Sequence, residues 1–157
     1  MHSYSFFIYL HHLRHLALML WLMSAVLLSA RAHCFEEAGT KFGIDPFLLK
    51  AIAQVESSMN PKAVNHNRNG TQDLGLMQIN SSHLVRLSKD GVTREKLLND
   101  ECLSVMVGAE ILSGFITRFG YTWRAVGAYN AGGGSSRDNL REQYARKVVR
   151  EYRRIAP

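Results

Sequence analysis

Residues 54–82 constrain the fold of this 157-residue chain more than any other segment. Apolar positions spaced three and four residues apart lead up to Val55, and this spacing predicts a helix with one buried face. Pro61 ends the helical pattern, and Asn69-Gly70 is a strong signal for a tight hairpin turn. Residues 74–79 then form an apolar stretch. A helix and a hairpin must therefore face each other within this short segment.

Two acidic residues of the segment have contrasting surroundings. Glu56 lies at the C-terminal end of the predicted helix, where the helix dipole disfavours negative charge and apolar neighbours favour the neutral acid. Asp73 lies in a polar hairpin, where we expect it to stay ionised. A neutral and an ionised carboxyl group divide the roles of proton donor and charge stabiliser in glycosidic bond cleavage. The simpler alternative is that both are surface acids, one at a helix end and one on a hairpin.

The N-terminal residues 1–32 predict a cleavable signal peptide. A weakly basic start precedes an apolar run over residues 16–28, and Ala30-Arg31-Ala32 matches the small-residue cleavage pattern. A permanent membrane helix is the alternative, but this run is shorter than the roughly 20 residues that a span requires. A lipid anchor at Cys34 is disfavoured, because the preceding residue is His33 rather than a small residue.

Cleavage after Ala32 leaves residues 33–157, which is enough chain for one compact domain. Two cysteines remain, Cys34 and Cys102, and in an oxidising compartment we expect them to form a disulfide. Closing such a long loop contributes about 4 kcal/mol in the chain-entropy model. Two free buried thiols would require a reducing compartment, which export rules against.

The spacing along residues 33–157 predicts a mainly α (α+β) domain with one small β-hairpin sheet. Asp45 and Pro46 form a typical helix start, with the acid as cap and proline at the first helical position. We found no repeats or long linkers. Predicted helices cover residues 33–42, 46 to the stop at Pro61, 77–89, 93–99, 100–119, 123–130 and about 138–154, and predicted strands cover 64–66 and 72–75.

Positive charge is concentrated at the C-terminus of a chain whose net charge is +6. Residues 33–136 are balanced, whereas residues 137–157 carry a basic excess. This tail is either the solvated face of a terminal helix or a docking surface for an anionic polymer or partner protein. Nucleic acid is a poor fit, because the excess is small and no binding motif accompanies it. The basic residues of the tail are Arg137, Arg141, Arg146, Lys147, Arg150, Arg153 and Arg154.

Three separated motifs carry a family resemblance. They are V-E-S-S-M-N-P-K-A-V from residue 55, D-L-G-L-M-Q-I-N from residue 73 and A-Y-N-A-G from residue 128. In this order they resemble the lytic transglycosylase domain, the peptidoglycan-cleaving branch of the lysozyme superfamily. The resemblance spans roughly residues 35–152 and is closest to the small exported enzymes of type III secretion, type IV secretion and conjugation systems. It implies a lysozyme-like fold and a periplasmic, monomeric enzyme that cleaves peptidoglycan glycan strands without a cofactor.

The first two motifs imply roles for five residues. Glu56 matches the catalytic acid/base of the family, and Ser57 follows it as in the family's Glu-Ser pair. Gly75 matches the glycine that lets the backbone approach the sugar, and Gln78 matches a glutamine that hydrogen-bonds it. Met77 also falls in this substrate-binding motif, with plain core packing as its alternative.

The third motif and the last helix contribute three more residues to the implied site. Tyr129 is expected beside the catalytic carboxyl group, and Asn130 follows it in the substrate-binding motif. Tyr144 resembles a tyrosine that many family members direct towards the site, although packing against the helix bundle is the simpler reading.

Asp73 departs from many family members, which have no second carboxylate. In those enzymes the C6 hydroxyl of muramic acid attacks the anomeric carbon, and the product is a 1,6-anhydro sugar. Residues 56–81 also resemble, without a gap, the corresponding stretch of animal-type lysozyme, in which a second carboxylate falls at Asp73. The alternative is that Asp73 only orients the hairpin.

Three hypotheses follow. The first is a lytic transglycosylase that opens the wall locally for an envelope-spanning apparatus, whose subunits are candidate partners. The second is a muramidase that uses Glu56 and Asp73 to add water, and the third is a non-catalytic wall-binding assembly protein. The histidines His33, His66 and His83 lack the spacing of a zinc site, so we expect no metal.

Overall fold

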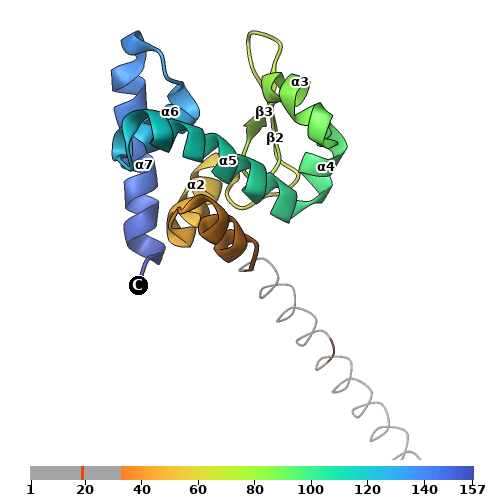
Figure 1. The fold of residues 1–157 in the computed structure, drawn as a ribbon, viewed down its shortest axis with the longest axis horizontal. Coiled ribbons are helices and arrows are strands. Elements are labelled where there is room, and N and C mark those ends of the chain that lie inside the picture. The colour runs from red at the N-terminus through yellow and green to blue at the C-terminus, as the bar shows by residue number, and fades with distance from the viewer. Residues whose placement is uncertain (1–18, 20–32) are drawn as a thin grey trace, which may run out of the picture. The chain divides into compact units, whose positions relative to one another are not determined.

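The computed structural model describes residue 19 and residues 33–157. Apart from residue 19, the predicted signal peptide therefore lies outside the described residues. Residues 34–157 form one unit, and its ribbon is shown in Figure 1. After a helical segment at residues 33–42, its elements are α2 (Pro46–Ser57), β1 (Val64–His66), β2 (Gln72–Leu74), β3 (Ile79–Asn80), α3 (Leu84–Leu87), α4 (Arg94–Asn99), α5 (Glu101–Phe119), α6 (Trp123–Ala131) and α7 (Asp138–Ile155), with 3-10 turns at Ser81–His83, Ser88–Asp90 and Ser135–Arg137.

Helix α5 runs between two groups of elements. The helices α2, α6 and α7 lie on one side of it, and the small sheet with α3 and α4 lies on the other (Figure 1). The predicted class, a mainly helical domain with one small sheet, is confirmed.

Helix α2 starts as predicted but ends earlier. The Phe47 amide donates to Asp45 Oδ1 (2.8 Å), and Pro46 occupies the first turn. The predicted stop at Pro61 is wrong, because the helix already ends at Ser57, where Ser58 and Met59 take left-handed φ values of 52° and 64°. Glu56 therefore lies in the last turn of α2.

The sheet is antiparallel in the order β1-β2-β3. The two predicted strands are confirmed, and Asn65 and Asn80 are the neighbours of Asp73 on β1 and β3. A helix starting at residue 77 was also predicted, and this is wrong. Positive φ values at Gly75 (73°) and Gln78 (49°) turn the chain back, so that residues 79–80 pair with β2 instead.

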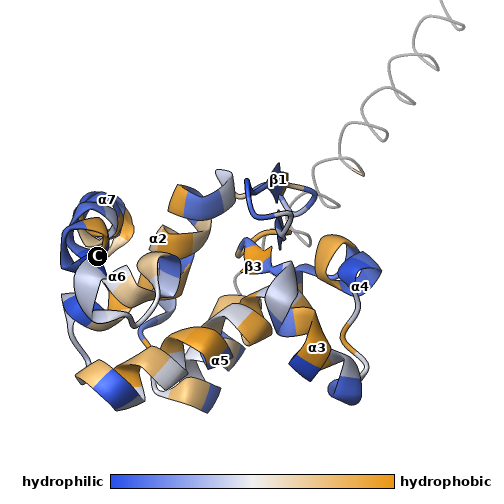
Figure 2. Ribbon diagram, turned by 90° about the horizontal axis from the view of Figure 1, so that it is seen from above, coloured by the Kyte–Doolittle hydropathy of each residue, from blue (hydrophilic) through white to orange (hydrophobic). Residues whose placement is uncertain are grey.

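Helix α5 is the core element of the domain. Figure 2 shows it as largely hydrophobic, and Val105, Ala109 and Leu112 are fully buried. Among the described helices it alone has the length (19 residues) and mean hydropathy (1.4) of a candidate membrane span. Its packing against α2, α4, α6 and β3 accounts for this apolar composition as the core of the domain.

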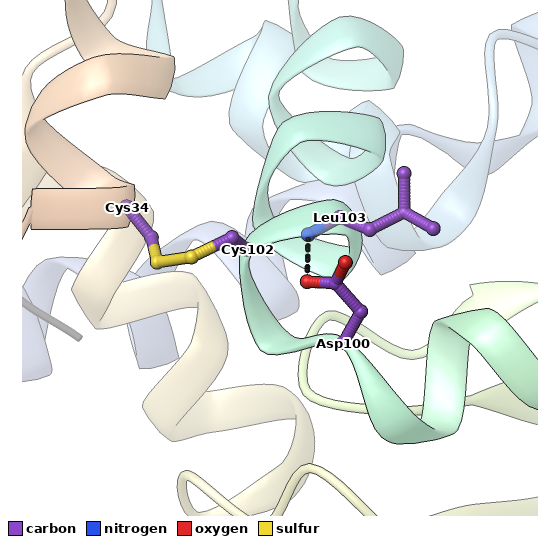
Figure 3. Close-up of a disulfide and its surroundings, with 4 residues drawn as sticks. All are labelled: Cys34, Asp100, Cys102 and Leu103. Atoms are coloured by element: carbon purple, nitrogen blue, oxygen red, sulfur yellow. Dashed lines mark hydrogen bonds between the residues drawn. A yellow bond between two sulfur atoms is a disulfide. The ribbon is translucent and has the colours of Figure 1, made fainter. Parts of the chain in front are cut away.

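The start of α5 is held in two ways (Figure 3). Asp100 accepts a hydrogen bond from the Leu103 amide (2.9 Å), which caps the helix. Cys102 forms a disulfide with Cys34, 68 residues earlier in the chain. The predicted pairing is confirmed, and it ties the segment at residues 33–42 to the core helix.

Helix α7 packs against both α2 and α6. Gly127 of α6 permits the close approach, since a Cβ there would lie 2.4 Å from the Arg141 carbonyl oxygen. Tyr144 and Val148 face the core, whereas Lys147 and Arg150 are exposed. Most of the basic tail thus lies on the exposed face of this terminal helix, whereas Arg141 is buried.

Candidate active site

Glu56 lies at the wall of a cleft of about 710 Å³, which the sheet, α5 and the end of α6 also line. Burial raises the pKa of Glu56 to about 7, and the nearby negative charge of Asp73 acts in the same direction. The Tyr144 hydroxyl and the positive charge of Lys147 oppose this rise without cancelling it. Near neutral pH a substantial fraction of Glu56 therefore carries the proton that a general acid must donate.

Two predicted site tyrosines lie on α6 and α7, and only the α7 tyrosine donates a hydrogen bond to the Glu56 carboxyl group. The Tyr144 hydroxyl donates to Glu56 Oε1 (2.6 Å), although the residues lie 88 positions apart. Its ring is also buried in the core, so Tyr144 both packs and contacts Glu56. The Tyr129 hydroxyl donates instead to the Met77 carbonyl oxygen (2.8 Å). Burial raises the pKa of both tyrosines well above the ordinary value, so both remain hydrogen-bond donors.

Asp73 lines the same cleft as Glu56. Asn67 Nδ2 donates to its Oδ2 (3.0 Å), and Asn80 Nδ2 donates to its Oδ1 (2.7 Å). These amide donors hold the carboxylate on the cleft side of the sheet and at the same time link β2 to β3 and to the hairpin turn. Both sequence interpretations of Asp73, as a second carboxylate of the site and as an organiser of the hairpin, are therefore compatible with its position.

Three residues of the predicted substrate-binding set support the cleft from behind. The Ser57 hydroxyl donates to the Leu76 carbonyl oxygen (2.7 Å) and so ties α2 to the sheet. A Cβ at Gly75 would lie 2.4 Å from the Leu97 carbonyl oxygen, so this glycine permits close packing on α4. Met77 is fully buried against Gly108 of α5, which agrees with the core-packing interpretation of its side chain.

Gln78 and Asn130 line the cleft, as predicted for groups that contact a sugar. Gln78 is 8% exposed and is held in place by Asn65, which donates to its Oε1 (2.7 Å), while its own Nε2 donates to the Gly75 carbonyl oxygen (2.9 Å). Asn130 is exposed at the end of α6.

The sequence predictions missed the asparagines that hold Asp73. Asn80 closes the second motif, and Asn67 lies in the asparagine-rich hairpin turn, so a local signal existed for both. They also missed the α5 residues Ile111 and Phe115, which form an apolar part of the cleft wall. Their role depends on which face of α5 is turned towards the sheet, and that is a tertiary property. In the part of the chain that the structure describes, no group of three or more His, Cys, Asp or Glu side chains is placed to hold a metal ion.

A lysozyme-like helical domain, a cleft and a glutamic acid of raised pKa at its wall are typical of enzymes that cleave glycosidic bonds. The chain belongs to the transglycosylase SLT domain family, which matches residues 33–150, and it is a peptidoglycan lytic transglycosylase.

Comparisons with known proteins agree with this assignment. The invasion protein IagB of Salmonella typhimurium is 49% identical over 138 residues, which cover 88% of this chain and 85% of IagB. The protein IpgF of Shigella flexneri is 46% identical over 126 residues, covering 80% and 83% of the two chains. An inactive mutant of the lytic transglycosylase Slt from Pseudomonas aeruginosa has a similar fold, with a TM-score of 0.62 at 22% identity, over 76% of this chain and 23% of Slt.

Proposed function

We propose that this enzyme cleaves the β-1,4 bond between MurNAc and GlcNAc and forms 1,6-anhydroMurNAc. The single observation that supports this most strongly is Glu56, which combines burial, a pKa of about 7 and a hydrogen bond from Tyr144. One group with a pKa near the working pH can act first as acid and then as base.

The proposed reaction needs no water. Protonated Glu56 donates its proton to the glycosidic oxygen, and the bond from that oxygen to C1 of MurNAc breaks. The C6 hydroxyl of the same MurNAc then attacks C1, and the Glu56 carboxylate takes the hydroxyl proton. Glu56 is thereby protonated again, and the positive charge that develops on the sugar is stabilised by the negative charge of Asp73 in the same cleft.

A muramidase reaction is the second candidate. It is motivated by Asp73, which lines the cleft together with Glu56 and is held there by Asn67 and Asn80. In that reaction a water molecule, rather than the C6 hydroxyl, supplies the oxygen that joins C1.

Product analysis separates the two reactions. We expect mass spectrometry of peptidoglycan digested by the purified enzyme to show anhydro ends, which are lighter than reducing ends by one water. Reducing ends without anhydro sugar would instead establish the muramidase. Glu56→Gln should lower the rate by roughly a hundredfold or more in either case. Unchanged wall cleavage by this variant would contradict the assignment of Glu56 as the catalytic acid, and absence of cleavage by the wild type would favour the non-catalytic hypothesis.

We further propose that the enzyme acts in the periplasm and opens the wall for a secretion apparatus. The predicted signal peptide and the disulfide between Cys34 and Cys102 support an exported location. The name of IagB, an invasion protein, supports the connection with secretion. A chromosomal Glu56→Gln allele should reduce secretion through the apparatus while total synthesis of its substrates stays the same, and undiminished secretion would contradict this role.

A further inference from the structure

A second cavity lies on the α7 side of Glu56. It has a volume of about 430 Å³ and lies between the end of α2, the end of α6 with Arg137 beyond it, and α7. It shares Glu56, Asn130 and Arg137 with the larger cleft, so the two cavities adjoin at the catalytic acid. We call it the α7 pocket, and its lining includes Glu56, Asn130, Arg137, Leu140, Gln143 and Lys147.

The α7 pocket is basic apart from Glu56. Arg137 and Lys147 both line it, and Glu56 is the one acid among its described lining residues. Within the described chain, no carboxylate lies at ion-pair distance from Lys147, whereas the neighbouring Arg146 is paired with Glu142 (2.6 Å). Lys147 and Glu56 line the same pocket, and the positive charge of Lys147 lowers the pKa of Glu56.

The rest of the lining suits a carboxylate that is part of a larger organic group rather than a bare ion. Asn130 and Gln143 offer amide groups that can both donate and accept hydrogen bonds. Leu140, which is 52% exposed, adds an apolar surface on α7. The volume exceeds what a small anion would fill.

We propose that the α7 pocket binds a carboxylate carried by the muramic acid substituent, through Lys147 and Arg137. This inference rests on the proposed function. In peptidoglycan the lactyl group of muramic acid carries a stem peptide with free carboxylates, and after removal of the peptide the lactyl group itself ends in a carboxylate. Both sources present the same chemistry to a lysine and an arginine.

Binding of this carboxylate has a consequence for the catalytic acid. Free Lys147 lowers the pKa of Glu56, and a bound carboxylate next to Lys147 compensates its charge. Glu56 then holds its proton more firmly in the complex than in the free enzyme. Occupation of the pocket thus favours the protonation state with which the reaction starts.

Calorimetric titration of the full mature chain tests the proposal. All variants carry Glu56→Gln so that ligands stay intact. The ligands are a GlcNAc-MurNAc tetrasaccharide with stem peptides, the same tetrasaccharide without peptides, and chitotetraose, which has no carboxylate. Lys147→Gln is compared with Arg146→Gln, which makes the same charge change at the adjacent position outside both cavities. Arg137→Gln serves as a second, independent pocket variant.

We expect Lys147→Gln to weaken binding of the peptide-bearing ligand by roughly threefold to fivefold, as for one exposed charge pair. Chitotetraose binding should be unchanged, and Arg146→Gln should change neither. If the lactyl carboxylate is the bound anion, Lys147→Gln should weaken binding of the peptide-free tetrasaccharide at least as much as binding of the peptide-bearing ligand. Unchanged affinities for both MurNAc ligands in Lys147→Gln, or an equal weakening of chitotetraose binding, would overturn the proposal. A Glu56→Gln protein that binds neither MurNAc ligand would overturn it as well. None of these outcomes alters the anhydro product of the wild-type enzyme, which tests the proposed function separately.

Discussion

The proton of Glu56 depends on a balance among neighbouring residues. Burial and the charge of Asp73 raise its pKa, while the Tyr144 hydroxyl and Lys147 lower it. The result, about 7, is near neutral pH, so both protonation states of Glu56 are accessible there. Because Tyr144 and Lys147 both lie on α7, this helix tunes the acid that α2 provides.

Tyr144→Phe should move the alkaline limit of activity to higher pH. The Tyr144 hydroxyl stabilises the ionised form of Glu56, so its removal raises the pKa of Glu56 above about 7. Activity requires the protonated form and is lost as the pH rises through this pKa. The rate on peptidoglycan should be measured between pH 5 and pH 9.

Tyr152→Phe is the matched control, because this α7 tyrosine donates its hydroxyl hydrogen bond to Asp45, the cap residue of α2, and lines neither cavity. An alkaline limit that stays in place or moves to lower pH in Tyr144→Phe would contradict the assigned role of this hydrogen bond.

Glu56→Gln should stabilise the folded protein at alkaline pH. The folded-state pKa of about 7 exceeds the ordinary value of 4.5, so the stability of the wild type is fully present below pH 4.5 and decreases as the pH rises through 7. The neutral glutamine avoids this loss. We expect a gain on the order of 3 kcal/mol in the free energy of unfolding at pH 8, and none below about pH 4.5.

Urea unfolding at both pH values measures this difference. Glu142→Gln, on the exposed side of α7, should show no comparable change. A Glu56→Gln variant that is no more stable than the wild type at pH 8 would show that burial of the ionised Glu56 carboxylate does not lower the free energy of unfolding.

At the scale of elements, the turn between β2 and β3 decides the shape of the cleft. Gly75 and Gln78 have positive φ values, and the turn brings Gln78 to the cleft while it seats Gly75 on α4. Ser57 fastens the end of α2 to the same turn through the Leu76 carbonyl oxygen. The helix that carries the acid and the sheet that carries Asp73 are thereby held as one unit.

Gly75→Ala should destabilise the protein more than Gly70→Ala. Both glycines have positive φ values (73° and 81°), so alanine costs about 1 kcal/mol at either position for conformation alone. At Gly75 the new Cβ would also lie 2.4 Å from the Leu97 carbonyl oxygen, whereas at Gly70 nothing lies within 4 Å. We expect an additional loss of about 1–3 kcal/mol for Gly75→Ala, measured by urea unfolding. An equal loss of stability in the two variants would contradict this prediction, because it would show that the turn accommodates the new Cβ at residue 75 without disturbing its packing on α4.

At the scale of the whole molecule, the disulfide between Cys34 and Cys102 joins the N-terminal helical segment to α5. This covalent link spans 68 residues, a stretch that includes both Glu56 and Asp73. It limits the freedom of the unfolded chain over the entire first half of the domain.

Replacing both cysteines by alanine should lower the free energy of unfolding by about 4 kcal/mol. Below the unfolding transition the activity should be retained, because neither cysteine lines the cleft. Thermal unfolding of the wild type with and without reductant, beside the double variant, measures the effect. A reduced wild type that unfolds at the same temperature as the oxidised protein would contradict it.

Short stretches of sequence determine several local features of this protein. The start of α2 at Asp45 and Pro46, the first two strands and the candidate acid Glu56 all depend on residues within a few positions of one another. Local hydrogen bonding and apolar spacing decide such features, so they can be predicted without coordinates.

The tertiary structure alone decided how these parts act together. The contact between Tyr144 and Glu56 joins residues 88 positions apart, and the α7 pocket is formed by residues of α2, α6 and α7, which are distant in the chain. The strand at residues 79–80 and the end of α2 at Ser57 depend on left-handed backbone at Gln78, Ser58 and Met59, which the apolar spacing does not predict. Desolvation, which gives Glu56 its proton, depends on segments that are distant in the chain, and spacing rules do not contain that information.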